Sequence, residues 1–111
     1  MEKCPFCEVL KSEGQIILRG DKVTAIKKLY KSNNVNFLIV SNEHINNLKE
    51  YRSEEHKEIL SEIVDMANKL ASKSKNSGDW SMVINNGSHS NQTVFHLHAH
   101  ISSGDSYRSW F

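Results

Sequence analysis

The spacing of hydrophobic residues predicts one long amphipathic helix in the middle of the chain. It begins near Ser53, because serine is a favoured N-cap and Glu54 and Glu55 suit the positive end of a helix dipole. Apolar residues then recur at spacings of three and four until about Ser74, which predicts one buried face. This stripe consists of Ile59, Leu60, Ile63, Met66, Ala67 and Leu70. His56, in the first turn, is expected at the surface.

Shorter apolar runs, separated by polar or glycine-containing breaks, predict five strands. They cover residues 15–19, 23–29, 37–40, 80–84 and 93–101. A short helix is expected from Pro5 to about Ser12, a helical turn over 46–51 and a polar loop over 31–34. The mostly short connections favour antiparallel pairing. The expected fold is α+β, a five-stranded antiparallel sheet with one long helix and a short N-terminal helix, in a single domain spanning residues 1–111.

Composition and charge narrow the classes of function. The 111 residues carry a formal net charge of +1 and an aromatic content of 8%, which indicate neither a basic nucleic-acid binder nor a base-stacking platform. No apolar run approaches the roughly 20 residues that cross a bilayer. The N-terminal stretch MEKCPFCEVLK lacks the apolar core of a signal peptide. We therefore expect a cytoplasmic protein without nucleic-acid or membrane partners.

The two cysteines, Cys4 and Cys7, form a C-P-F-C pair. Cytosolic thiols are rarely held as structural disulfides. A redox pair of this form usually follows a strand at the start of a helix, and here only three residues precede Cys4. Half of a zinc site is the better interpretation if other ligands exist.

The segment His96-Leu97-His98-Ala99-His100-Ile101 carries the most chemical information. On a strand its three imidazoles share one face, roughly 6.5–7 Å apart, and the apolar residues share the other. Imidazole can ligate a metal, act as a nucleophile or transfer protons near neutral pH. An exposed histidine-rich strand or an adventitious metal site is the alternative. The polar loop over 85–92 could present amide and hydroxyl donors to phosphate oxygens.

These residues resemble the histidine triad (HIT) family. Its members carry His-x-His-x-His with apolar residues between, after an Asn-x-Gly turn and a Gln-Ser/Thr-Val segment. Many also carry an N-terminal C-x-x-C pair and a Glu/Lys-His-Ile segment after the third strand. The matching stretches here are Asn85–Gly87, Gln92–Val94, His96–Ser102, Cys4–Cys7 and Glu43–Ile45. They occur in the same order, and the resemblance covers nearly the whole chain.

The resemblance implies a covalent mechanism. The middle histidine, His98, would attack an α-phosphate and form a nucleotidyl-histidine intermediate. His100 matches a position that contacts phosphate and helps with protons. Asn85 matches a position near the phosphate, and Gln92 and Thr93 match positions that contact the transferring phosphoryl or the leaving group.

The resemblance also implies a structural zinc ion held by a closed set of two thiolates and two imidazoles. The four ligands would be Cys4, Cys7, His44 and His96. Two buried free cysteines and two hydrogen-bonded histidines are the alternative. Members of the family are commonly homodimers, and Trp110 matches a C-terminal tryptophan that reaches the partner's active site in some of them. Packing of Trp110 on its own subunit is the alternative.

One departure from the family concerns the nucleoside pocket. Lys28 stands where many relatives carry the aspartate that binds the ribose hydroxyls, and a cation cannot accept those bonds. Before the triad, Ser90-Asn91 replaces the usual Ala-Gly. The row of histidines is intact, so the chemistry is more strongly indicated than the substrate.

The expected function is that of a nucleoside monophosphate phosphoramidase or nucleotide hydrolase, acting on a nucleoside monophosphate conjugate at the α-phosphate. The first alternative is a nucleotide-binding regulatory module with little or no turnover. The second is a zinc-stabilised interaction protein with a vestigial triad.

Overall fold

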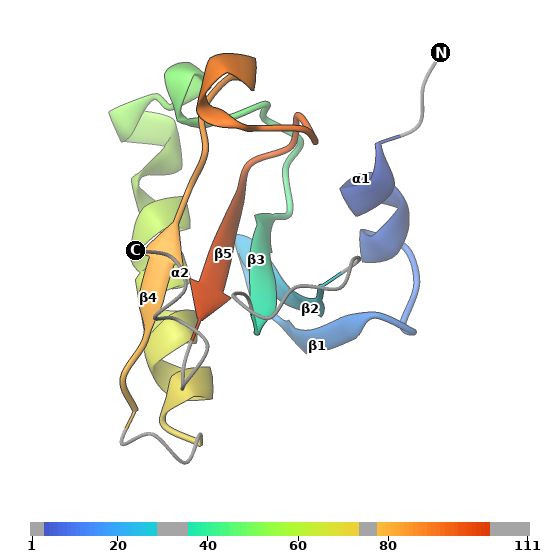
Figure 1. Cartoon of the computed structure of the whole chain (residues 1–111), viewed down its shortest axis with the longest axis vertical. Coiled ribbons are helices and arrows are strands. Elements are labelled where there is room, and N and C mark those ends of the chain that lie inside the picture. The colour runs from blue at the N-terminus through green and yellow to red at the C-terminus, as the bar shows by residue number, and fades with distance from the viewer. Residues whose placement is uncertain (1–3, 29–35, 74–77, 103–111) are drawn as a thin grey trace.

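The protein is built on one antiparallel sheet with a helix on each side (Figure 1). The computed structural model describes residues 4–28, 36–73 and 78–102. The strands are β1 (Ile16–Arg19), β2 (Val23–Lys27), β3 (Phe37–Ser41), β4 (Ser81–Val83) and β5 (His98–Ser102). The helices are α1 (Pro5–Leu10), α2 (Ser53–Ala71) and the 3-10 turns η1 (Leu48–Glu50) and η2 (Ser88–Ser90). The sheet order β1-β2-β3-β5-β4 confirms the predicted fold class.

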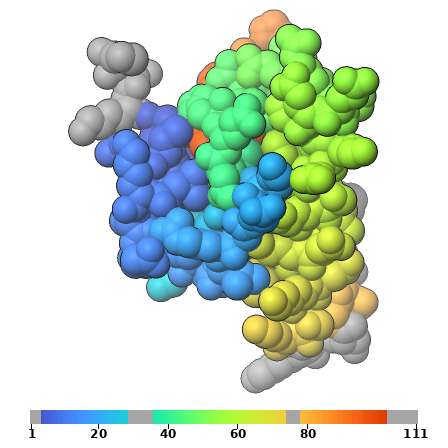
Figure 2. Space-filling view, turned by 180° about the vertical axis from the view of Figure 1, so that it is seen from behind, coloured from blue at the N-terminus to red at the C-terminus, as the bar shows by residue number. Residues whose placement is uncertain are grey.

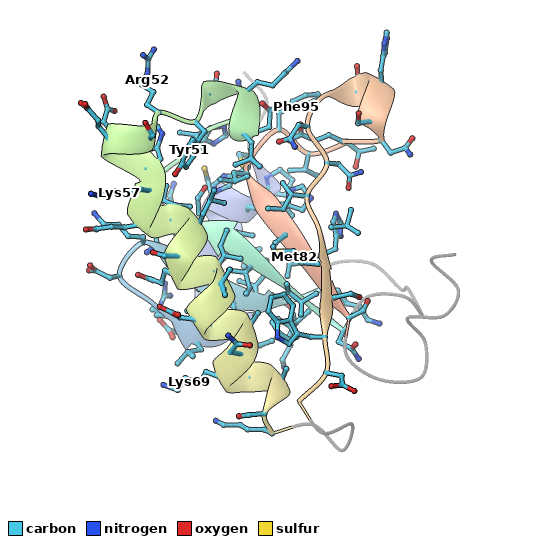
Figure 3. The ribbon with its side chains drawn as sticks, turned by 90° about the vertical axis from the view of Figure 1, so that its left-hand side faces the viewer. Tyr51, Arg52, Lys57, Lys69, Met82 and Phe95 are labelled. Carbon is cyan, nitrogen blue, oxygen red and sulfur yellow. The ribbon has the colours of Figure 1, made fainter. Side chains whose placement is uncertain are left out.

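The long helix α2 covers one face of the sheet. Its predicted stripe is confirmed, since Ile59, Ile63 and Met66 are buried against the inward residues of β2, β3 and β5. Burial of each large apolar side chain contributes about 1.5–3 kcal/mol. Lys57 and Lys69 point away from the sheet (Figure 3), and α2 forms much of the surface seen from behind (Figure 2). Within the described ranges, no helix combines the length and apolar character of a membrane span.

The other face of the sheet carries the histidine row and is covered by α1. A second apolar cluster forms there, in which Phe6 of α1 packs with Ile26, Leu38 and Val40. Strand residues alternate between faces, so His98 shares this side with Val40, its partner across β3 and β5. The N-terminal segment therefore lies directly over the candidate chemistry.

Two expectations about the start of α2 were wrong. The N-cap is Arg52 rather than Ser53, and the Arg52 side chain makes no capping bond. The buried imidazole of His56 caps the helix instead, because its Nδ1 accepts the Arg52 backbone N–H at 2.8 Å. Only 4% of His56 is exposed, so the predicted surface position is incorrect. Its Nε2 lies 3.9 Å from a Glu43 carboxylate oxygen, which gives the buried ring a polar neighbour.

The last strand is shorter than predicted, and β5 begins at His98 rather than at residue 93. Leu97 bonds to the last residue of β3 and to the loop that follows β3. The Leu97 N–H donates to the Ile45 carbonyl at 2.7 Å, while the Leu97 carbonyl accepts from Ser41 N–H. The predicted loop over 31–34 lies outside the described residues. The helix α2 ends at Ala71, with Ser72 as its C-cap, slightly before the predicted end near Ser74.

Gly20 is required where α2 meets the turn between β1 and β2. A Cβ there would lie 2.6 Å from the Val23 carbonyl oxygen, 2.8 Å from the Met66 methyl carbon and closer still to a Glu62 carboxylate oxygen. That carboxylate accepts the Lys22 and Val23 backbone N–H groups and joins the helix to the turn.

We expect Gly20→Ala to lower the free energy of unfolding by about 2–3 kcal/mol, because backbone and helix must move to admit the methyl group. Gly14→Ala is the matched control, since nothing lies within 4 Å of its Cβ position. Urea unfolding of both variants measures the difference. Equal stability of the two variants would contradict this account of the turn.

Candidate active site and metal centre

The imidazole of His98 is held in one orientation by three contacts. Its Nδ1 lies 2.7 Å from the His96 carbonyl oxygen, which can only accept, so Nδ1 carries the proton and Nε2 keeps its lone pair. The Phe6 ring lies edge-on at a centroid distance of 4.8 Å, and the His100 ring lies at 4.8 Å on β5. The two imidazoles lean together, closer than the predicted strand spacing. His98 therefore offers a neutral, oriented nitrogen.

Burial keeps the histidine row uncharged. It lowers the pKa of His98, which is only 7% exposed, against the opposing effect of the bond to the His96 carbonyl. Burial, and then repulsion from His98, lowers the pKa of His100 to about 4. Both rings are consequently neutral at pH 7 before a ligand binds, and the nucleophilic form of His98 needs no separate base.

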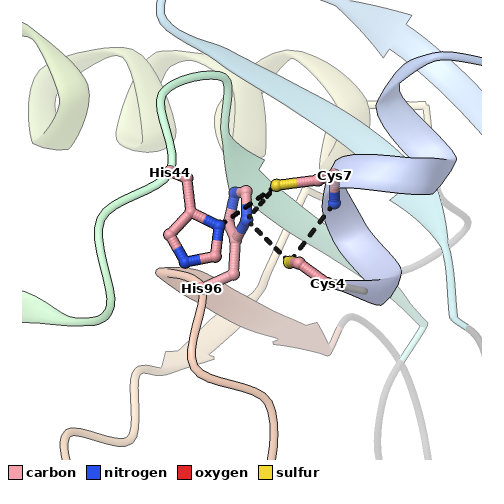
Figure 4. Close-up of side chains that lie close together, drawn as sticks. All are labelled: Cys4, Cys7, His44 and His96. Atoms are coloured by element: carbon pink, nitrogen blue, oxygen red, sulfur yellow. Dashed lines mark hydrogen bonds between the residues drawn. The ribbon is translucent and has the colours of Figure 1, made fainter. Parts of the chain in front are cut away.

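The four predicted metal ligands, Cys4, Cys7, His44 and His96, come together beside this row (Figure 4). Their ligand atoms all lie within 4.8 Å of one another. Nδ1 of His96 is 3.3 Å from Cys4 Sγ and 3.6 Å from Cys7 Sγ, and Nδ1 of His44 is 3.1 Å from Cys7 Sγ. A tetrahedral ion bound to thiolate and imidazole separates sulfur from nitrogen by about 3.5 Å. The cluster therefore fits a metal ion.

The other nitrogen of each cluster imidazole is held by an oxygen. His96 Nε2 donates to the Ser41 carbonyl at 2.7 Å, and His44 Nε2 donates to Asn46 Oδ1 at 3.3 Å. Asn46 is itself held by Glu50, which accepts its backbone and side-chain N–H groups. These outer contacts direct both Nδ1 lone pairs at the sulfurs, as metal sites require. Burial and the neighbouring Cys4 raise the pKa of the Cys7 thiol, so a metal would displace its proton.

Gln92 is buried and fully hydrogen-bonded within the protein. Its Nε2 donates to the carbonyls of Asn46 and Val94, and its Oε1 accepts from the Asn47 side chain and from Gly87 N–H, all within 2.9 Å. An amide has two hydrogens and two acceptor sites, so none remains for a ligand. The geometry gives Gln92 the role of joining the loop before the triad to the loop that carries His44.

Gln92→Glu is expected to cost roughly 3–5 kcal/mol of stability, because a carboxylate oxygen would replace the donor facing two carbonyls in a buried site. Gln15→Glu makes the same chemical change at an exposed residue and should alter stability by less than about 0.5 kcal/mol. Thermal unfolding of the two variants distinguishes this structural role from a direct contact with a ligand. If Gln92 acted only by contacting a ligand, Gln92→Glu would leave the free protein nearly as stable as the wild type.

Asn85 and Thr93 lie in the segment between β4 and β5. The Asn85 amide donates to the Ser90 carbonyl at 2.6 Å, which shapes the turn over η2. Thr93 is exposed and lines a groove of about 610 Å³. Its other lining residues are Cys4, Pro5, His44, Asn46, Val94 and Phe95. Phe95, labelled in Figure 3, is 44% exposed. Trp110 lies outside the described residues.

Comparison with known proteins settles the family. The family model described as scavenger mRNA decapping enzyme C-term binding matches residues 3–111. A solved HIT family hydrolase from Clostridium thermocellum is 34% identical, with a TM-score of 0.82 and coverage of 95% of this chain and 93% of that one. The chain belongs to the histidine triad family.

Other histidine triad proteins are similar over nearly the same length. A solved histidine triad protein from Clostridium difficile is 28% identical, with a TM-score of 0.81 and coverage of 95% of each chain. The purine nucleoside phosphoramidase of Escherichia coli is 26% identical over 106 residues, which cover 93% of this chain and 88% of that protein. Membership supports hydrolase chemistry in general terms, and neither likeness fixes a substrate.

Several residues that support the site carried no separate signal in the sequence. Ser41 contributes only a backbone oxygen, which any residue type could supply. Asn47 acts through Gln92, 45 positions away. Phe6 lies inside the C-P-F-C pair and reads as an ordinary core residue. Only Asn46, two residues after His44, could have been suspected, because a nearby amide often orients a ligating imidazole.

Proposed function

We propose that this protein hydrolyses conjugates of nucleoside monophosphates, phosphoramidates among them, through a covalent intermediate on His98. The observation that carries the proposal is the bond from His98 Nδ1 to the His96 carbonyl, which leaves a neutral Nε2 to attack phosphorus. The phosphoramidase activity named for the Escherichia coli relative supports the same class of substrate.

The reaction would proceed in two displacements at one phosphorus. First, His98 Nε2 bonds to the α-phosphorus as the bond to the leaving amine breaks, and the amine takes up a proton. Water then attacks the phosphorus and gives up one proton as the bond to Nε2 breaks, and the nucleoside monophosphate leaves with the hydroxyl group. Division into two steps replaces one difficult displacement with two easier ones.

His100 is the candidate to move protons. Its ring contacts His98, and a bound phosphate would raise its pKa from about 4 by supplying a negative charge. The Thr93 hydroxyl and the Asn85 amide are the candidate donors to the phosphoryl oxygens. Gln92 would act indirectly, because it holds the loop that carries both of these residues.

The metal centre would be structural, and zinc is the ion we propose. Cys4, Cys7, His44 and His96 fill a tetrahedral set with no open position for substrate. When bound, the ion would supply a cross-link between the N-terminal segment, the loop after β3 and the segment that leads into β5. A cytoplasmic homodimer, with Trp110 reaching the partner's site, is the assembly that we propose.

Hydrolysis of a panel of nucleoside 5′-phosphoramidates tests the proposal. We expect turnover of at least one member and a ranking of bases and sugars that reflects Lys28 at the expected ribose position. Binding of the corresponding monophosphates without any turnover would overturn the proposal and favour a nucleotide-binding module. Failure to bind any of them would favour an interaction protein.

A further inference from the structure

Phe6 is the side chain that joins the metal centre to the candidate nucleophile. It lies between the two cysteines in sequence and is only 2% exposed. Its ring packs against His96, a metal-centre residue, at 5.8 Å and an interplanar angle of 89°. The same ring packs against His98 at 4.8 Å and 64°. One rigid side chain therefore contacts both imidazoles.

The backbone around Phe6 is fixed by the cluster. Cys4 is the N-cap of α1, and its sulfur accepts the Cys7 backbone N–H at 3.4 Å. Pro5 occupies the first turn, where its ring restricts the backbone. A helix of 6 residues is too short to be stable alone, so its position depends on what its ends bind.

One hydrogen bond and two ring contacts orient the His98 imidazole. The bond from Nδ1 to the His96 carbonyl fixes one atom and leaves the ring free to tilt about that contact. The rings of Phe6 and His100 limit this tilt. A displaced Phe6 would let Nε2 swing away from the line of attack, and small misplacements of a reacting group lower rates severely.

We propose that Phe6 is a positioning residue that transmits the state of the Cys4–Cys7–His44–His96 cluster to the orientation of His98. An intact cluster holds α1 against the sheet and presses the Phe6 ring onto His98. A disrupted cluster loosens α1 and releases the ring. The kinetic part of this inference rests on the proposed function, whereas the orientation of the His98 imidazole can be measured without it.

Phe6→Leu tests the inference, with Val9→Ala as the matched control. Leucine keeps apolar bulk but removes the ring. Val9 lies on the same helix and packs on the same apolar cluster as Phe6, and it has no ring. The readouts are bound metal, the NMR signal of the His98 Nδ1–H and, for adenosine 5′-phosphoramidate, kcat and KM. A third variant, His44→Ala, disturbs the metal-ligand cluster at its exposed member and leaves the two half-buried cysteines and the buried His96 in place.

We expect Phe6→Leu to retain metal, to shift the His98 Nδ1–H signal and to lower kcat about tenfold with little change in KM. Val9→Ala should leave the signal and kcat close to those of the wild type. His44→Ala should shift the same signal in the wild-type background and have no further effect on it in Phe6→Leu. The last comparison separates transmission through Phe6 from a general loosening of the domain.

Two results would overturn the inference. One is a His98 signal in Phe6→Leu that matches the signal in Val9→Ala. The other is a signal that His44→Ala shifts equally with and without the Phe6 ring. If the wild type shows no turnover, the proposed function fails, and the NMR comparison still decides the role of Phe6.

Discussion

His98→Ala is expected to reduce hydrolysis of a nucleoside phosphoramidate by at least about a thousandfold while the protein still folds and binds its metal. The methyl group cannot attack phosphorus, and the residual rate would come from binding alone. The Cys and His ligands do not include this residue, so metal content should match that of the wild type. Single-turnover kinetics, with circular dichroism and metal analysis of the same sample, measure all three properties.

His100→Gln is the control for His98→Ala. It alters the neighbouring imidazole on the same strand and keeps the proposed nucleophile, so a partial loss of rate is expected. A His98→Ala protein that retains wild-type turnover, or that loses its fold and its metal together with activity, would contradict the assignment of His98 as the nucleophile.

His96→Ala should act on stability and metal content. The substitution removes one of four ligands and leaves the buried Ser41 carbonyl without its 2.7 Å donor. We expect a loss of roughly 3–5 kcal/mol, which lowers Tm by about 10–20 °C in a domain of this size, and less than one metal ion per chain. Differential scanning calorimetry and elemental analysis check these values.

His89→Ala serves as the control for His96→Ala. His89 is exposed in η2, outside the cluster and the histidine row, and its substitution should leave Tm and metal content unchanged. Wild-type metal content and Tm in His96→Ala would show that the four side chains meet without forming a structural site. Equal destabilisation by His96→Ala and His98→Ala would contradict the separate roles of the two histidines, structural for His96 and chemical for His98.

The fold was predictable where local pattern determines burial. The stripe from Ile59 to Ala67 predicted α2 and its buried face, because the apolar residues recur with the helical period and are the residues that become buried. Compact apolar runs predicted β2 and β3, which are both interior strands of the sheet. The C-x-x-C pair by itself indicated only half of a zinc site, and the resemblance to the histidine triad family named the complete set of cluster residues.

The incorrect expectations concern contacts that are remote in sequence or that use the backbone. His56 looked like a surface residue because its neighbours are charged, yet it is buried as the acceptor for Arg52 N–H. The segment 93–97 alternates like a strand, but its Leu97 N–H bonds to Ile45 in a loop. The expectation that Gln92 contacts a ligand stays a prediction, and its four hydrogen bonds to two separate loops favour a supporting role instead.

If His98 is the nucleophile, it becomes covalently bonded to the substrate's phosphorus, and the bonded enzyme can be trapped. The wild type would be mixed with a stoichiometric amount of adenosine 5′-phosphoramidate, quenched in alkali to preserve phosphohistidine, and mapped by peptide mass spectrometry. We expect one adenylyl group on His98 and none in His98→Ala. Turnover without an adduct, or an adduct on a different residue, would show that His98 is not the nucleophile.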